Sequence, residues 1–213
     1  MEVLQKECLG DFGNRPFVLT PSILYIDPQA FGFHDVPQFE QRGDNEHYSV
    51  KDGVLFNADG TVLVKYPGKR EENEYVIPEG TSEIGPGAFQ KCVYLEKISL
   101  PSSLKVIGED AFRWCSALEE IEYSEDTMIE TIGEYAFNSC DSLKEIELPP
   151  VKVIEQSAFG DCGSLQTVHL AEGTREIGDS VFTDTAVSSP VFPKSLKKIG
   201  NYVNDFGDNV SDA

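Results

Sequence analysis

Four regularly spaced cysteines are the residues most capable of chemistry in this chain. Cys92, Cys115, Cys140 and Cys162 lie 22 to 25 residues apart, whereas zinc sites recruit close pairs such as C-x-x-C. We expect a ladder of buried, reduced thiols that holds no metal. Disulfides between neighbouring copies are disfavoured, because Cβ atoms must approach to about 3.8 Å while stacked strands lie about 4.8 Å apart. Cys8 stands outside the pattern and is expected to be a free thiol.

Other catalytic constellations are missing from the sequence. His34, His47 and His169 show no H-E-x-x-H or other paired-ligand spacing. The chain also has no Gly-rich phosphate loop, no G-x-S-x-G and no EF-hand loop. Repeat-equivalent cysteines are expected to be structural, which argues against a thiol nucleophile. We therefore expect no enzymatic activity and no cofactor.

The charge of the chain restricts its partners. The 213 residues include 37 acidic and 17 basic side chains, for a formal net charge of −20. Long-range repulsion opposes binding to nucleic acid or to an anionic bilayer. We therefore expect neither nucleic-acid binding nor direct membrane binding. No run of about 18 apolar residues occurs, and the first residues do not form an export signal, so the sequence itself leaves the compartment open.

An internal repeat runs through the second half of the chain. The segment P-E-G-T-S-E-I-G-P-G-A-F at 78–89 recurs nearly unchanged at 171–182 as A-E-G-T-R-E-I-G-D-S-V-F. Between and beyond them an isoleucine anchor returns at steps of 23, 25, 22, 23 and 22 residues, at Ile84, Ile107, Ile132, Ile154, Ile177 and Ile199. A phenylalanine follows each of the first five anchors by five residues, at Phe89, Phe112, Phe137, Phe159 and Phe182.

The repeat also contains a strand-like pattern, L-x-x-I-x-L, after each cysteine. A fixed period of 20 to 29 residues with this pattern predicts a leucine-rich repeat solenoid. The predicted fold belongs to the α/β-type superfamily of such solenoids. It is rich in parallel strands, with short irregular or 3-10 segments on the convex side. One turn cannot bury its apolar positions alone, so equivalent residues must stack from turn to turn. Glycine after the anchor is expected to permit a tight bend.

At these residues the chain resembles a known family. Segments such as I-G-E-D-A-F-R-W-C-S-A-L-E-E-I-E-Y-S (107–124) are similar to the BspA-like, treponemal-type leucine-rich repeats. The resemblance is strong from about Tyr75 to Gly200 and weaker at Phe17 to Phe31. It implies a secreted or surface-exposed protein that mediates adhesion to host proteins or to other cells.

Between the weak and the strong repeats lies a β-prone insertion. Val54–Phe56 and Thr61–Tyr66 are expected to form a hairpin, with Asp59-Gly60 in a type I′ turn. We divide the chain into an N-terminal segment with a divergent repeat (1–47), the hairpin and a charged loop (48–74), the leucine-rich repeats (75–200) and a polar tail (201–213).

The variable face of the repeat is the candidate binding site. Side chains that alternate with the buried strand positions must point outward. Those expected to line up on the concave sheet face are Lys97, Ser99, Glu120, Glu122, Glu145, Glu147, Thr167 and His169. We call these eight residues the acidic face. It is either a solvated surface of an acidic protein or a recognition strip for a basic partner protein.

Two functions of different kinds fit these features of the sequence. The first is a non-catalytic module that binds another protein, whose identity the sequence does not give. The alternative is a structural spacer or self-associating segment of a larger surface protein. Exposed apolar area at Phe192 or Tyr202, near the last turn, would favour the alternative.

Overall fold

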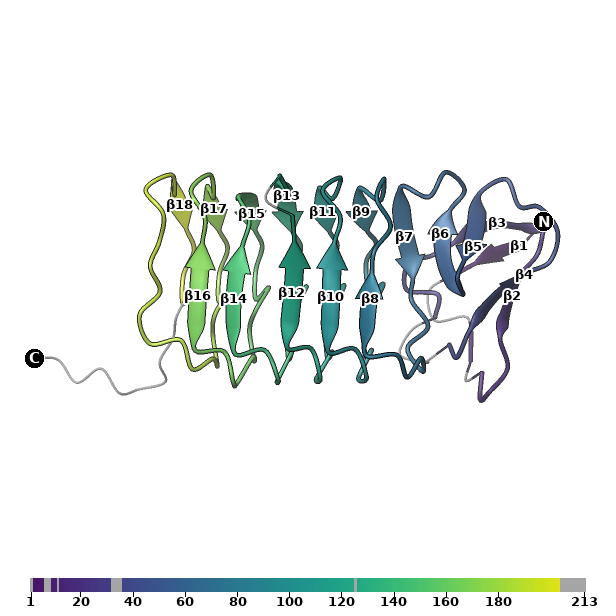
Figure 1. Cartoon of the computed structure of the whole chain (residues 1–213), viewed down its shortest axis with the longest axis horizontal. Coiled ribbons are helices and arrows are strands. Elements are labelled where there is room, and N and C mark those ends of the chain that lie inside the picture. The colour runs from purple at the N-terminus through teal and green to yellow at the C-terminus, as the bar shows by residue number, and fades with distance from the viewer. Residues whose placement is uncertain (1, 6–8, 11, 32–35, 125, 204–213) are drawn as a thin grey trace, which may run out of the picture.

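The structure is a computed structural model that describes residues 2–5, 9–10, 12–31, 36–124 and 126–203. Strands and turns make up this part of the chain, and no helix occurs in it. Successive turns of chain stack side by side along the long axis of the molecule, with the N-terminal strands at one end (Figure 1). The leucine-rich repeat solenoid expected from the repeat period is therefore confirmed.

One row of strands comes from the L-x-x-I-x-L segments and from the segment Glu74–Val76 before them, and we call its members the front strands. In chain order they are β8 (Glu74–Val76), β10 (Lys97–Leu100), β12 (Glu120–Tyr123), β14 (Glu145–Leu148) and β16 (Thr167–Leu170). They lie side by side in Figure 1. Strand β10 pairs in parallel with both β8 and β12, and β14 pairs in parallel with β16.

A second row of strands contains the isoleucine anchors, and we call it the anchor sheet. Its parallel members are β9 (Glu83–Ile84), β11 (Val106–Ile107), β13 (Ile129–Ile132), β15 (Val151–Ile154), β17 (Glu176–Ile177) and β18 (Lys198–Ile199). The anchors are in register from each strand to the next. The sequence predicted the stacking of these residues but not that they form a hydrogen-bonded sheet. The I-G-x-x-A-F-x-x-C segments that follow the anchors are turns rather than 3-10 helices.

The core lies between the two rows. The five ladder phenylalanines are at most 1% exposed, and the first four stack with centroids 4.8 to 5.1 Å apart and planes within 10°. The four ladder cysteines are buried free thiols. Each Sγ from Cys115 onward donates a hydrogen bond to the phenylalanine carbonyl of the preceding turn, at 3.0, 3.3 and 3.1 Å. These bonds satisfy the three thiols as weak donors.

Glycine follows the anchor for a reason other than the expected bend. Gly108 and Gly133 have ordinary backbone angles and do not lie in the left-handed region. A Cβ at Gly133 would lie 2.7 Å from the nitrogen of Glu109 and 2.8 Å from the carbonyl carbon of Gly108. Side chains are excluded here because the backbones of successive turns approach closely.

At two bends of the chain, which we call corners, a glutamate side chain forms hydrogen bonds with the next turn of the solenoid. Glu79, in the first of the two near-identical segments, accepts hydrogen bonds from the backbone N–H and the Oγ of Ser102, both at 3.0 Å. In the second segment, Glu172 accepts from the backbone N–H groups of Lys194 and Ser195, at 3.0 and 3.1 Å. The repeated E-G-T sequence thus makes similar hydrogen bonds to the following turn at both places.

The insertion before the repeats contains three strands rather than the two expected. Strands β5 (Tyr48–Lys51), β6 (Val54–Asn57) and β7 (Val62–Lys65) form an antiparallel meander, and β7 continues the anchor sheet through parallel pairing with β9. The expected type I′ turn at Asp59-Gly60 is wrong, because only Gly60 has a positive φ. Both residues of Asp52-Gly53 have positive φ, at 50° and 75°, so the two-residue turn of this geometry joins β5 to β6.

The N-terminal strands enclose a core of their own. Strand β1 (Glu2–Leu4) pairs in parallel with β3 (Ile23–Ile26), and β2 (Phe17–Leu19) pairs in parallel with β4 (Phe39–Gln41). Strand β6 separates the two cores, because Leu55 packs into the N-terminal cluster whereas its neighbours Val54 and Phe56 belong to the main one.

The last turns depart from the pattern. Val191 follows Pro190 in the fifth copy of the repeat, the one whose anchor is Ile177. It forms only an isolated β-bridge, to His169. The absence of a full strand agrees with the missing donor of Pro190. Val191, Ile199 and Tyr202 are 77%, 50% and 71% exposed, and Phe192 is half-buried. Most of the polar tail assigned to 201–213 lies outside the described residues.

Candidate protein-binding face

The front strands expose every second side chain, as a half-buried sheet requires. The side chains of Ile98, Ile146 and Val168 face the core and are at most 6% exposed. Residues on either side of each of them, together with Glu120 and Glu122 on either side of the half-buried Ile121, point outward and make up the acidic face. In register, Lys97 lies beside Glu120 and Ser99 beside Glu122. Likewise, Glu145 lies beside Thr167 and Glu147 beside His169.

Lys97 offsets part of the negative charge on this face. Its Nζ lies 2.7 Å from Glu122 Oε1 and 3.3 Å from Glu120 Oε2. The Oγ of Ser99 donates a second hydrogen bond to Glu122, at 3.1 Å. The hydrogen bond from Lys97, followed by the one from Ser99, lowers the pKa of Glu122, and the same contact with Glu122 raises the pKa of Lys97. The first half of the face is thus internally paired.

The second half of the face has less compensation. His169 Nε2 lies 3.6 Å from Glu145 Oε1, an ion pair only when the imidazole is protonated. No lysine or arginine among the described residues forms an ion pair with Glu145 or Glu147. The two carboxylates therefore carry most of the uncompensated charge of the acidic face.

The four glutamates of the acidic face lie on two neighbouring front strands that are not paired with each other. The front strands form two separate groups, and no strand pairing joins β12 to β14 in the described part of the chain. Glu119 and Glu120 donate their backbone N–H groups to the carbonyl of Glu96 in the preceding turn, at 2.8 and 3.1 Å. The equivalent backbone bonds from Lys144 and Glu145 to the preceding turn do not form.

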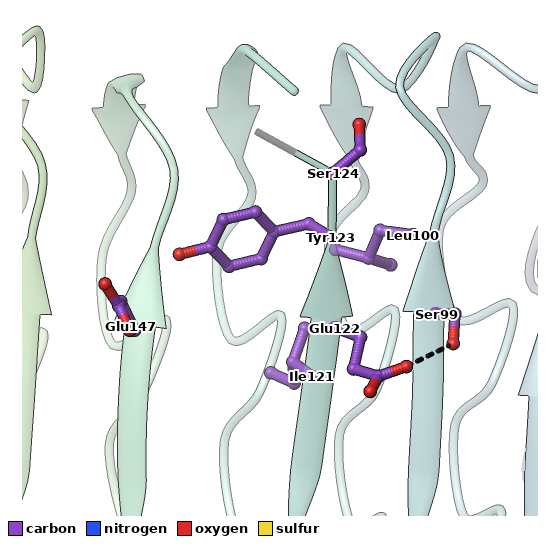
Figure 2. A pocket seen from close by; sticks show the side chains of 7 residues that line it. All are labelled: Ser99, Leu100, Ile121, Glu122, Tyr123, Ser124 and Glu147. Carbon is purple, nitrogen blue, oxygen red and sulfur yellow. Dashed lines mark hydrogen bonds between the residues drawn. The ribbon is translucent and has the colours of Figure 1, made fainter. Parts of the chain in front are cut away.

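An open depression of about 620 Å³ lies along this break. It is lined by Ser99, Leu100, Ile121, Glu122, Tyr123, Ser124 and Glu147. Figure 2 shows the ring of Tyr123 extending from β12 toward β14, while Glu122 turns the other way, toward Ser99. Burial, and secondly the charge of Glu147, raise the pKa of the Tyr123 hydroxyl.

Tyr123 and Ser124 were not among the candidate binding residues named from the sequence, where Tyr123 appeared only as a strand position of the repeat. A signal for them exists, because the step from Ile107 to Ile132 is 25 residues and is the longest in the array. The extra length falls between Tyr123 and Ile129, after the front strand and before the anchor strand. Insertions of this kind in repeats map to loops, and they are often placed at a binding surface.

The other candidate residues do not form a reactive site. Burial is the main cause that raises the pKa of the Cys115 and Cys140 thiols well above its ordinary value, so both are poor nucleophiles at neutral pH. No cluster of three or more histidine, cysteine or acidic side chains suited to a metal occurs among the described residues. His47 is exposed. Cys8 and His34 lie outside the described residues.

A family comparison agrees with this geometry. The family model described as the BspA type leucine-rich repeat region matches six copies across residues 75–209. The chain belongs to this leucine-rich repeat family. No curated protein matches it in sequence. In the described residues no helix has the length and apolar character needed to cross a bilayer.

Solved structures of similar proteins share the fold of this BspA-type chain. A leucine-rich cell surface protein from Faecalibacterium prausnitzii is 29% identical, with a TM-score of 0.73 over 88% of this chain and 48% of that one. The pneumococcal vaccine antigen PcpA is 25% identical, with a TM-score of 0.66 over 86% and 50%. A leucine-rich repeat protein of T. pallidum is 26% identical, with a TM-score of 0.59 over 76% and 83%. The chain spans about half the length of the first two proteins.

Proposed function

We propose that this chain is a non-catalytic protein-binding module of a secreted or cell-surface protein, acting in adhesion or in protein-protein interaction. The observation that carries the proposal is the acidic face, a rigid row of outward side chains whose charge is only partly compensated within the protein. A basic surface on a partner would complete the pairing. The similarity to a cell surface protein and to a vaccine antigen supports a surface location.

A binding screen against purified host matrix and cell-surface proteins tests the proposal. Each candidate is measured at about 20 mM and about 300 mM salt, because the distance over which exposed charges interact falls from about 20 Å to about 6 Å between these ionic strengths. We expect a specific partner whose association slows at high salt. Absence of binding to every protein in the panel would contradict an adhesive role toward these proteins.

Charge reversal then locates the binding face. Changing Glu120, Glu122, Glu145 and Glu147 together to lysine is expected to abolish binding while the protein remains folded, because all four side chains are exposed. The matched control reverses four exposed carboxylates of the N-terminal half, Glu40, Asp44, Glu46 and Glu71, and so changes the net charge by the same amount. If both variants lose affinity equally, the acidic face is not the specific site.

A second candidate function is self-association through the C-terminal turns. The exposed apolar side chains of Val191, Ile199 and Tyr202 favour it, since Ile199 belongs to the last strand of the anchor sheet and Val191 bridges to His169 of the last front strand. Sedimentation at several protein concentrations would detect such association. Replacement of the three residues by serine should then return the protein to a monomer.

A further inference from the structure

We propose that the break between β12 and β14 is an anchor site for one arginine side chain of the protein partner. The inference rests on the proposed function and makes it more specific, because it names the contact that would fix the register of a partner on the acidic face. Three features of the break support it: unpaired backbone, an aromatic ring and uncompensated carboxylates.

The backbone along the break has hydrogen-bonding groups to offer. In a parallel strand, the N–H and C=O groups of alternate residues face opposite neighbours. Because Glu120 donates to the turn before it, the main-chain groups of Ile121 and Tyr123 face β14. Neither residue has a backbone partner there among the described residues. Both are half-buried, so their carbonyls need water or a ligand to satisfy them.

Tyr123 supplies a flat surface at the same place. The equivalent positions of the neighbouring front strands are Leu100, Leu148 and Leu170. A tyrosine here directs its ring across the break, as Figure 2 shows. A guanidinium group stacks on such a ring through cation–π attraction, which is stronger where the site is partly dry.

The charge around the ring selects a cation. Glu147 lines the depression, and its charge acts on the Tyr123 hydroxyl. On the side of β12 that faces β10, Glu122 already accepts hydrogen bonds from Lys97 Nζ at 2.7 Å and from Ser99 Oγ at 3.1 Å. Glu147 has no such cation among the described residues, so it is the carboxylate available to a new one.

Arginine matches this combination better than lysine does. Its planar guanidinium carries five N–H donors, so one side chain can stack on the ring, pair with Glu147 and donate to a backbone carbonyl. The lysine ammonium is a compact, strongly hydrated charge that cannot stack in this way. The partner therefore presents an exposed arginine within a basic segment, and the remaining glutamates of the face attract that segment.

Acetyl-argininamide is a probe for the site that does not require the partner to be known. Titration into ¹⁵N-labelled protein is expected to shift the backbone amide signals of 121–124 and 145–148. Acetyl-citrullinamide has nearly the same shape but no charge, and is expected to leave these signals unchanged. Equal shifts with both compounds, or shifts spread over all exposed acidic residues, would overturn the proposal.

Substitutions of Tyr123 and Glu147 test whether these two side chains contact the bound acetyl-argininamide. Tyr123→Leu installs the residue of the neighbouring turns, and we expect it to fold and to weaken acetyl-argininamide binding by about fivefold through loss of the cation–π contact. Tyr123→Phe keeps the ring and should retain the binding. Glu147→Gln should weaken it as well. The matched control is Glu130→Gln, which removes the same charge from an exposed position of the anchor sheet, and it should have no effect. A loss of binding in Glu130→Gln equal to that in Glu147→Gln would reduce the effect to general electrostatics and overturn the site.

The inference and the proposed function can fail separately. If a partner binds the acidic face but Tyr123→Leu leaves its affinity unchanged, the arginine site is wrong and the binding module stands. If acetyl-argininamide binds at the break and no protein partner exists, the binding module is wrong and the site is a property of the fold.

Discussion

Replacement of Phe137 would measure how much ring stacking contributes to the stability of the array. Phe137 is 1% exposed and stacks on Phe112 and Phe159, at 4.9 and 5.1 Å with planes within 3° and 2°. Phe182 is equally buried, but the centroids of the Phe182 and Phe159 rings are 5.9 Å apart and the ring planes differ by 23°. Because the two phenylalanines bury the same fraction of surface, the difference between their alanine variants reports mainly on stacking.

The expected magnitudes follow from this geometry. Truncation of a buried phenylalanine to alanine costs about 3 to 5 kcal/mol, from lost burial and the cavity left behind. Each well-stacked pair contributes about 0.5 to 1.5 kcal/mol beyond burial. We expect Phe137→Ala to lower the free energy of unfolding by about 1 kcal/mol more than Phe182→Ala, because it removes two close pairs instead of one looser pair.

Urea denaturation of both variants provides the assay. The fluorescence of Trp114, the single tryptophan, and the far-ultraviolet circular dichroism should give coincident transitions if the array unfolds as one unit. Equal losses for the two variants, or a greater loss for Phe182→Ala, would refute the view that the regular ring stack adds stability beyond burial.

Two further predictions concern the close approach of the turns and the thiol ladder. Gly133→Ala should lower the free energy of unfolding by about 1 to 3 kcal/mol, because the new Cβ would lie 2.7 Å from a backbone nitrogen of the preceding turn. Gly163→Ala is its control and should be nearly neutral, since no atom lies within 4 Å of the added Cβ; equal urea midpoints for both variants would contradict the packing argument. Burial raises the pKa of Cys115 and Cys140 above its value in the unfolded chain. Their contribution to stability is therefore full below about pH 8.5 and falls as the pH rises toward the folded-state pKa. In reducing buffer, the urea midpoint should drop less between about pH 7.5 and about pH 9.5 when both cysteines are alanine; an identical drop in the unmodified protein would contradict it.

Repetition made the core of this protein predictable. The spacing of Ile84, Phe89 and Cys92, copied turn after turn, indicated which side chains stack, because a short turn can bury them only against its neighbours. Alternation on either side of Ile98 indicated which residues of the front strands face outward. Both predictions depend on local periodicity, which a single sequence displays directly.

Features that depend on contacts between turns were not predictable in the same way. The anchor sheet arises from very short strands such as Glu83–Ile84, too short to show an alternating pattern. The I′ turn formed at Asp52-Gly53, which alone joins β5 to β6, whereas Asp59-Gly60 lies within the longer connection 58–61 between β6 and β7. The break beside Tyr123 coincides with the lengthened segment between Tyr123 and Ile129, and the missing strand pairing appears only in three dimensions.

The two E-G-T corners also bear on how such proteins change in length. Glu79 and Glu172 both accept hydrogen bonds from the turn that follows, and they are separated by four whole turns. Unequal crossing-over between the gene segments that encode them would add or delete those four turns and leave an established corner at the new junction. Selection would then act on the length of the array in whole turns, because the hydrogen bonds needed at the new junction already exist. Relatives whose arrays differ by fractions of a turn at this point would contradict that history.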